Sequence, residues 1–123
     1  MRNRILAIFL GFSAAAACQA DTARTWAMSG ADLARALEGK MPTQFHEGEV
    51  QRQFSSAYGQ AYILGVADET RGKHWCSSTG MLPHEMADRV YTYLSALSAE
   101  RLRGNAAPLV GEALQKELPC EQP

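Results

Sequence analysis

The segment ETRGKHWCSSTG, residues 69–80, places His74 and Cys76 two positions apart in a loop flanked by glycines. A cysteine near a histidine can act as an activated nucleophile, as a ligand of zinc or as one half of a disulfide. The first two roles require a thiolate, whereas the third requires an oxidising compartment. The compartment therefore decides what Cys76 can do.

A second motif, HEMAD at residues 84–88, begins like the HExxH helix that binds zinc in metalloproteases. Asp88 replaces the second histidine, so a zinc site here needs a further ligand from elsewhere in the chain. The alternative is an ordinary first helical turn, in which Glu85 faces the positive end of the helix dipole. Asp68 and Glu69 are neighbours in a predicted helix and therefore diverge. We expect no catalytic residue, metal site or cofactor.

Residues 1–20 predict export from the cytoplasm. Arg2 and Arg4 precede an apolar run and then small residues, which is the pattern of a bacterial secretory signal peptide. The run is shorter than the about 20 apolar residues that a membrane-spanning helix needs. Cleavage after residue 20 leaves a domain at residues 21–123 and predicts a periplasmic location. The alternative rests on AAAC, which resembles a lipobox and predicts an outer-membrane lipoprotein anchored through Cys18.

The charge balance of the mature chain narrows the classes of partner. It carries 10 Lys and Arg against 13 Asp and Glu, a net charge of −3. Proteins that bind nucleic acid cluster Lys and Arg on one face, so we expect no nucleic-acid partner. A chain of about 100 residues without repeats or linkers forms one domain with a small core.

Two cysteines remain after removal of the leader, Cys76 and Cys120. An even pair in an oxidising compartment predicts a disulfide. Closing a loop of about 45 residues removes unfolded-chain entropy worth roughly 4 kcal/mol, which is large for a small domain. We therefore expect Cys76 to be structural, with nucleophile and metal ligand as the alternatives.

Apolar residues recur at helical spacing through most of the mature chain. The predicted helices run from a Ser29 cap to Gly39, from about 47 to 69, from Pro83 onward, and from an Asn105 cap to Pro119. No segment alternates like a half-buried strand. The fold class is therefore all-α, a small single-domain bundle of four to five helices with one disulfide.

The buried faces follow from the same spacing. In the long helix we expect a buried stripe made of Val50, Phe54, Ala57, Ala61 and Leu64. In the last two helices we expect burial of Met86, Val90, Tyr93, Leu94, Leu97, Leu109, Val110, Ala113, Leu114 and Leu118. Gly59 and Gly65 inside the long helix predict close approach of a neighbouring helix.

The order of motifs resembles the Rap/Tai-type immunity family. The matching stretches are YILGVAD at 62–68, then Cys76, then VYTYLSA at 90–96, and APLVGEALQKELPC at 107–120. Members of that family are small exported helical proteins that neutralise peptidoglycan amidase effectors delivered by type VI secretion. The resemblance covers roughly residues 57–120 and implies the same fold, a non-enzymatic role and a cognate amidase as partner.

Two departures from the family pattern concern cysteines. Members commonly carry one cysteine near Gly59 and another near Leu37, and both are absent here. The paired loss suggests that one bridge is missing, while Cys76 and Cys120 still match each other. The usual "hP" after the third helix is also replaced by LSAERLRG, residues 97–104.

The resemblance further implies blockade, in which a homodimeric helical body presents a loop to the substrate cleft of the effector. The best candidate in this chain is the loop 71–82, with Trp75 as an apolar anchor of the kind enriched in binding hot spots. The polar residues that we expect to contact the partner are Arg71, Lys73, His74, Ser77 and Ser78. The alternative is that Trp75 packs inside the domain over the disulfide.

Three classes of function remain open. The first is an exported immunity protein that binds and blocks a type VI amidase effector. The second is an envelope binding or stress protein of the same fold with an unknown partner. The third is a small hydrolase or metalloenzyme that uses His74, His84 and Asp68.

Overall fold

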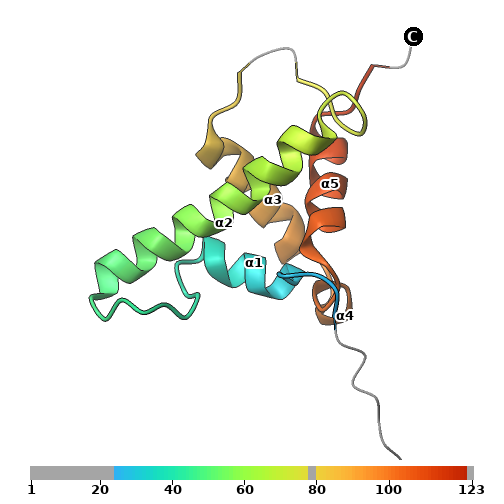
Figure 1. Ribbon diagram of the computed structural model, residues 1–123. Helices are drawn as coiled ribbons and strands as arrows, with labels where there is room; N and C mark the ends of the chain where they lie inside the picture. Colours follow the sequence, from blue (N-terminus) through green and yellow to red (C-terminus); the bar gives the residue numbers. More distant parts are fainter. Residues whose placement is uncertain (1–23, 78–79, 122–123) are drawn as a thin grey trace, which may run out of the picture.

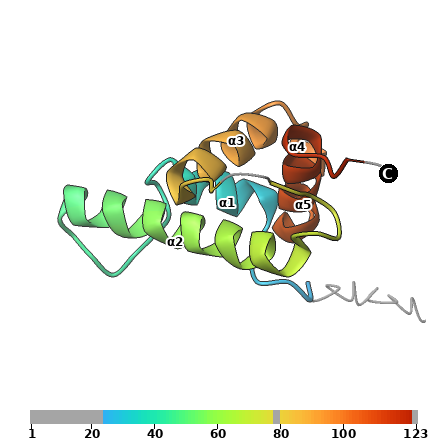
Figure 2. The same cartoon turned by 90° about the horizontal axis from the view of Figure 1, so that it is seen from above.

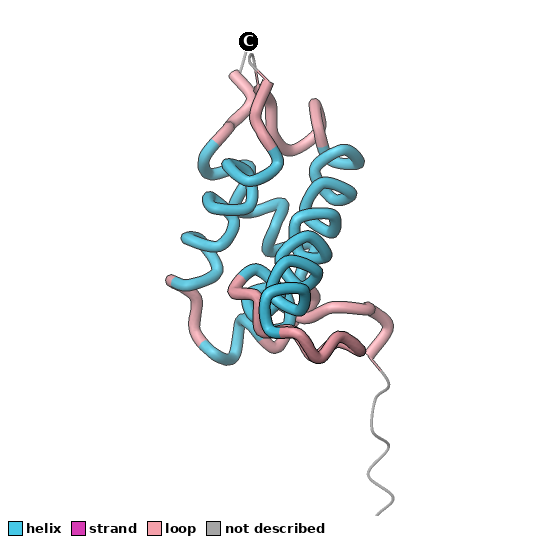
Figure 3. Tube along the Cα trace, turned by 90° about the vertical axis from the view of Figure 1, so that its left-hand side faces the viewer, coloured by secondary structure: helices cyan, strands magenta, loops and turns pink. Residues whose placement is uncertain are grey.

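The computed structural model describes residues 24–77 and 80–121 (Figure 1). Within those ranges the chain forms five helices and no strand, and Figure 3 shows the helices joined by loops. The helices are α1 (Gly30–Leu37), α2 (Gly48–Thr70), α3 (Pro83–Ser95), α4 (Ala99–Leu102) and α5 (Ala106–Glu117). The predicted all-α class with one disulfide is confirmed.

The long helix α2 forms one side of the molecule, and α1, α3 and α5 pack against the same side of it (Figure 2). Their apolar faces meet in one core. Its largest fully buried side chains are Trp75, Leu33, Ile63, Leu94, Leu114, Val90 and Val110. None of the helices in the described ranges has both the length and the hydropathy needed to cross a bilayer.

Helix α1 begins at a complete capping box. The Ser29 hydroxyl accepts the Asp32 N–H at 3.1 Å, and the Asp32 carboxylate accepts the Ser29 N–H at 3.2 Å. The hydrogen bond from the Ser29 hydroxyl, at 2.7 Å, lowers the pKa of Asp32 below its ordinary value. The chain leaves the helix at Gly39, whose φ of +75° is easy only for glycine. Both predicted ends of this helix are confirmed.

The buried face of α2 differs from the predicted one. The residues that face the bundle are Ser55, Gly59, Ile63 and Ala67. In the predicted stripe, Val50 and Phe54 are 40% and 43% exposed, Ala57 and Ala61 are exposed, and only Leu64 is half-buried. That prediction is wrong because helical spacing identifies an apolar stripe without showing which neighbouring helix covers it.

Small residues on α2 are buried because α1 lies very close to them. An ideal Cβ on Gly59 would stand 3.0 Å from Leu37 Cδ2 and 3.3 Å from Ala36 Cβ. Ser55 is fully buried, and its hydroxyl donates to the Ala36 carbonyl at 2.9 Å while accepting the Met41 N–H at 3.0 Å. Two satisfied hydrogen bonds make a polar core position tolerable. The close approach predicted from Gly59 is therefore present.

The two apolar stripes predicted near the C-terminus are confirmed at their centres. Helix α3 buries Met86, Val90 and Leu94, and α5 buries Leu109, Val110, Ala113 and Leu114. The remaining predicted members, Tyr93, Leu97 and Leu118, are half-buried and pack against the core. The start of α1 is joined to the start of α5 by two backbone bonds, Gly30 N–H to Gly104 O and Ala106 N–H to Met28 O, each 3.0 Å long.

The two glycines inside α2 should respond oppositely to substitution. Gly59→Leu forces a side chain into space held by Leu37 and Ala36, so we expect a loss of about 1–3 kcal/mol in the free energy of unfolding. At Gly65 an ideal Cβ meets nothing within 4 Å, so Gly65→Ala should gain up to about 1 kcal/mol from helix propensity. Urea unfolding followed by circular dichroism measures both, and equal effects of the same sign would contradict this packing.

Candidate partner-binding site

The chain reverses direction immediately after α2 in a short hydrogen-bonded turn, residues 71–77. The Thr70 carbonyl accepts the N–H groups of Lys73 and His74 at 3.1 and 3.0 Å. Gly72 takes a φ of +75° and donates its N–H to the Trp75 carbonyl at 2.8 Å. These bonds hold the backbone of the 71–77 turn in one conformation.

A disulfide fixes the far end of the same turn. Cys76 and Cys120 are bonded, with Cα atoms 4.7 Å apart and a sequence separation of 44. The Cys76 N–H also donates to the Leu118 carbonyl at 2.9 Å, which attaches the turn to the chain just after α5. The predicted disulfide is confirmed. In the disulfide Cys76 has no thiolate, so it serves neither as a nucleophile nor as a metal ligand.

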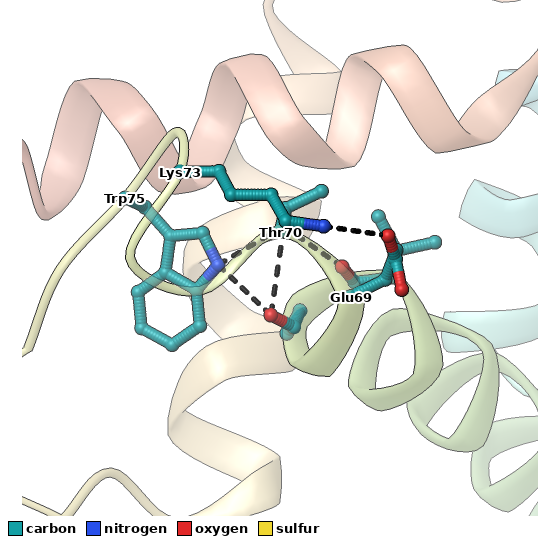
Figure 4. Close-up of polar contacts among 6 residues, drawn as sticks. Glu69, Thr70, Lys73 and Trp75 are labelled. Carbon is teal, nitrogen blue, oxygen red and sulfur yellow. Dashed lines mark hydrogen bonds and ion pairs between the residues drawn. The ribbon is translucent and has the colours of Figure 1, made fainter.

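Trp75 faces inward, not outward. Its side chain is fully buried, and Figure 4 shows the indole lying over the end of α2. The indole N–H donates to the Ala67 carbonyl at 3.0 Å and to the Thr70 hydroxyl at 3.1 Å. The expectation of an exposed Trp75 anchor is therefore wrong, because the short turn directs this side chain into the core. Its hydrophobic area stabilises the fold instead of a complex.

The charged residues predicted for the site do lie on the surface of the turn. The Arg71 guanidinium stands 5.1 Å from the centre of the Trp75 ring, where a cation–π contact is favourable. Lys73 pairs with Glu69 at 2.8 Å (Figure 4), and the hydrogen bond from Lys73 lowers the pKa of Glu69. His74 is exposed.

Of the two serines predicted to contact the partner, only Ser77 lies within the described residues. Ser77 is half-buried. Ser78 lies outside the described residues.

A groove between α2 and α5 adjoins the turn. Its volume is about 590 Å³, and His74 lies at its border. Gly65 and Gly111 line it from opposite helices, and an ideal Cβ on either one would meet nothing within 4 Å. Ala107 and Pro108 add further apolar surface. The groove exists because the helices carry small residues where they face each other.

Sequence reasoning missed this groove, although the interior glycines were a signal for it. Gly65 had predicted close approach of a helix, as at Gly59. The structure corrects that expectation, since no neighbouring atom takes the space beside Gly65. A helical glycine thus marks either tight packing or open space, and only the fold distinguishes the two.

Polar groups form one rim of the groove. Glu112 accepts hydrogen bonds from the Tyr93 hydroxyl and from Arg101, each at 2.6 Å. The bond from Tyr93 lowers the pKa of Glu112, and the same contact raises the pKa of Tyr93. The carboxylate therefore stays ionised and fixed at this edge near neutral pH.

The HEMAD segment lies in a different cleft. His84 and Asp88 line a polar cleft of about 410 Å³ together with Glu38 and Lys40, which follow α1, and with Ser56 and Gln60 of α2. The Glu85 carboxylate accepts the Leu82 N–H at 2.9 Å, which is the helix-start role described above. His74 and His84 line separate hollows, and no group of three His, Cys, Asp or Glu suited to a metal occurs among residues 24–77 and 80–121.

Substitution of Trp75 should lower the free energy of unfolding, because its side chain belongs to the core. Trp75→Ala removes a fully buried indole, so we expect a loss of about 3–5 kcal/mol in the free energy of unfolding. Trp75→Phe keeps most of the volume and loses the two hydrogen bonds of the indole N–H, for a loss of about 1–3 kcal/mol. Thermal unfolding of both variants tests the order, and an unchanged midpoint for Trp75→Ala would place the indole outside the core.

A search of curated proteins found no match to the chain. The family model of Rap1a immunity proteins matches residues 16–120, which include all five helices, the disulfide and the 71–77 turn. Because that match covers most of the sequence, the chain belongs to the Rap1a immunity protein family.

Proposed function

We propose that this protein is an exported, non-enzymatic immunity protein that binds and blocks a peptidoglycan amidase effector delivered by type VI secretion. Family membership over residues 16–120 carries the proposal, because immunity proteins act by binding a secreted effector and are generally not enzymes. The choice of an amidase as target rests on the motifs between residues 62 and 120 that resemble the Rap/Tai type.

The 71–77 turn is a projection that can enter a cleft of the partner without performing chemistry. The adjoining groove is a hollow that can receive a side chain of the partner. The turn is fixed by its backbone bonds and by the disulfide, so little conformational entropy is lost when a partner binds. Arg71, Lys73 and His74 are exposed on the turn and offer hydrogen-bond donors to a partner. The groove beside them offers apolar surface for a complementary side chain.

The proposal includes the cellular location. The leader at residues 1–20 supports a periplasmic protein, with lipidation at Cys18 as the alternative route. A disulfide that closes a 44-residue separation is consistent with an oxidising compartment. A periplasmic immunity protein can bind the amidase in the compartment where that enzyme would attack the cell wall.

Charge reversal on the turn tests the proposed contact surface. Lys73→Glu combined with His74→Ala should weaken binding to a catalytically inactive form of a type VI amidase effector that the unmodified protein neutralises. We expect about a tenfold loss at low salt, mainly through a slower association rate. The matched control is His84→Ala, because His84 is an exposed histidine in the other cleft. Biolayer interferometry measures both rates.

Two outcomes would contradict the proposal. If the unmodified protein neither binds that amidase nor protects cells that express it in the periplasm, the amidase assignment is wrong. If it binds and the turn variant keeps full affinity, the interface lies on another face.

Substitutions that fill the groove should raise the stability of the fold and weaken effector binding. Gly65→Ala with Gly111→Ala adds two methyl groups into open space, so we expect a gain of about 1–2 kcal/mol in the free energy of unfolding. The same methyl groups occupy the groove and should weaken effector binding. Circular dichroism and biolayer interferometry on the double variant measure the two effects. Greater stability with unchanged affinity would remove the groove from the interface.

A further inference from the structure

The groove between α2 and α5 is lined by carboxylates but by no permanent cation. Among the described residues that line it, Glu69 and Glu112 carry negative charge at neutral pH, and none is a lysine or an arginine. We propose that the groove receives a basic side chain of the effector, with its apolar stem between Gly65 and Gly111 and its charged head bonded to Glu112. This inference rests on the proposed function and names the kind of side chain that the groove selects.

Glu112 is held in place through one oxygen and keeps the other for a ligand. The Tyr93 hydroxyl and the Arg101 guanidinium both donate to Glu112 Oε2, each at 2.6 Å. None of the described residues donates to Glu112 Oε1. Since an ionised carboxylate can accept about four hydrogen bonds, this carboxylate has room for a further donor. Its orientation is already fixed, so a ligand that bonds to Oε1 loses little entropy in ordering it.

Glu69 repeats this arrangement on the facing helix. Lys73 donates to Glu69 Oε1 at 2.8 Å (Figure 4), and no donor to Glu69 Oε2 is present among the described residues. Lys73 and Arg101 thus hold the two carboxylates but do not line the groove themselves. A basic side chain that enters the groove meets free carboxylate oxygens, and its own charge is opposite to theirs. Charge complementarity therefore favours a cation as the occupant.

The shape of the groove suits a long side chain with an apolar stem. Its volume of about 590 Å³ lies in the range of ligand pockets. Ideal Cβ atoms on Gly65 and Gly111 would meet nothing within 4 Å, and Ala107 and Pro108 add apolar lining. Lysine and arginine lay their methylene groups along such a surface while the charged head stays at a polar edge. The groove offers both parts.

An apolar or aromatic side chain fits the same space less well. It would cover the free oxygen of Glu112 without donating a hydrogen bond to it. A carboxylate that loses water and gains no partner is costly, and this cost counts against the wrong side chain. The groove thus selects by charge as well as by size.

The groove and the turn beside it also fix the direction of the partner. Arg71 and Lys73 lie on the turn and suit an acidic spot on the effector, whereas Glu112 suits a basic one. An effector rotated by half a turn would place like charges together at both positions, which opposes binding. Two adjacent sites of opposite charge therefore give the complex one orientation.

Removal of one charge tests the inference in the complex. Glu112→Gln keeps the shape of the side chain, and we expect about a tenfold loss of affinity for the effector that the unmodified protein neutralises. Dissociation should become faster, because the lost contact lies inside the groove and not at its border. Glu117→Gln is the matched control, since Glu117 also lies on α5 and pairs with Arg89 at 3.3 Å but lines a different hollow. Biolayer interferometry measures the rates, and thermal unfolding checks the fold of both variants.

A double-mutant cycle identifies the basic residue of the effector. Each exposed lysine and arginine of the effector is changed to methionine, which keeps an apolar stem without the charge. One of these changes should weaken binding as much as Glu112→Gln does, and the two changes together should weaken it no further. If every lysine and arginine change adds in full to Glu112→Gln, no basic side chain contacts Glu112 and the inference is overturned.

A small probe tests the groove without the effector. N-acetyl-argininamide should shift the amide NMR signals of Gly65 and Gly111, and the uncharged N-acetyl-norleucinamide should shift them less. The shift should be lost in Glu112→Gln and kept in Glu117→Gln. Equal shifts with both probes, or none with either, would overturn the inference even where the effector binds. Failure of the unmodified protein to bind any amidase would contradict only the proposed function, because the probe measurement needs no effector.

Discussion

The contact between α1 and Gly59 of α2 determines which side of the long helix is buried. An ideal Cβ at Gly59 lies only 3.0 Å from the Leu37 side chain, so only a residue without a side chain lets the two helices come this close without a rearrangement. Ser55, one turn earlier, reinforces the contact with its bond to the Ala36 carbonyl. Because this face of α2 points inward, the apolar residues on the opposite face stay outside. The exposure of Val50 and Phe54 is therefore a consequence of how α1 packs.

The other end of α2 is held by a different set of interactions. There the indole of Trp75 bonds to the last turn of the helix, and the Cys76–Cys120 disulfide joins the following turn to the end of α5. Both helices that line the groove are therefore fixed by buried or covalent contacts, and Gly65 and Gly111 leave the space between them open. A hollow between two helices persists when their ends are held, since the walls cannot move together to close it.

Local signals in the sequence predicted the parts of the fold that depend on neighbouring residues. Ser29, Gly39 and Asn105 mark helix ends through bonds within a few residues, and each lies where the structure has a helix terminus. The disulfide was predicted because two cysteines remain after the leader and an oxidising compartment is expected. The fold class followed from periodicity, because helical spacing was present in nearly every segment.

The features that sequence reasoning missed depend on contacts between distant segments. The apolar spacing of α2 was read as a core stripe, whereas Ser55 and Gly59 have no hydrophobic side chain to show that α1 covers them. Trp75 is predicted as a surface anchor because large aromatic residues are enriched in binding hot spots. Its burial follows from the turn at Gly72, which brings the indole back to the last turn of α2. The sequence predicts close approach at both interior glycines, but only Gly59 has a close neighbour, while Gly65 faces open space.

The two positions at which the sequence departs from the family's cysteine pattern lie at the contact that buries Gly59. The family pattern that the sequence resembles has cysteines near positions 37 and 59, and in this chain an ideal Cβ on Gly59 would stand 3.0 Å from Leu37 Cδ2. A bridge and a close helix contact are alternative ways to hold α1 on α2 at one point, since a cysteine pair needs Cβ atoms about 4 Å apart. With glycine at 59, the restraint comes from packing and from the Ser55 bonds. That restraint needs no oxidation, so in this chain the orientation of α2 depends on the core, while only the turn beyond α2 depends on a disulfide.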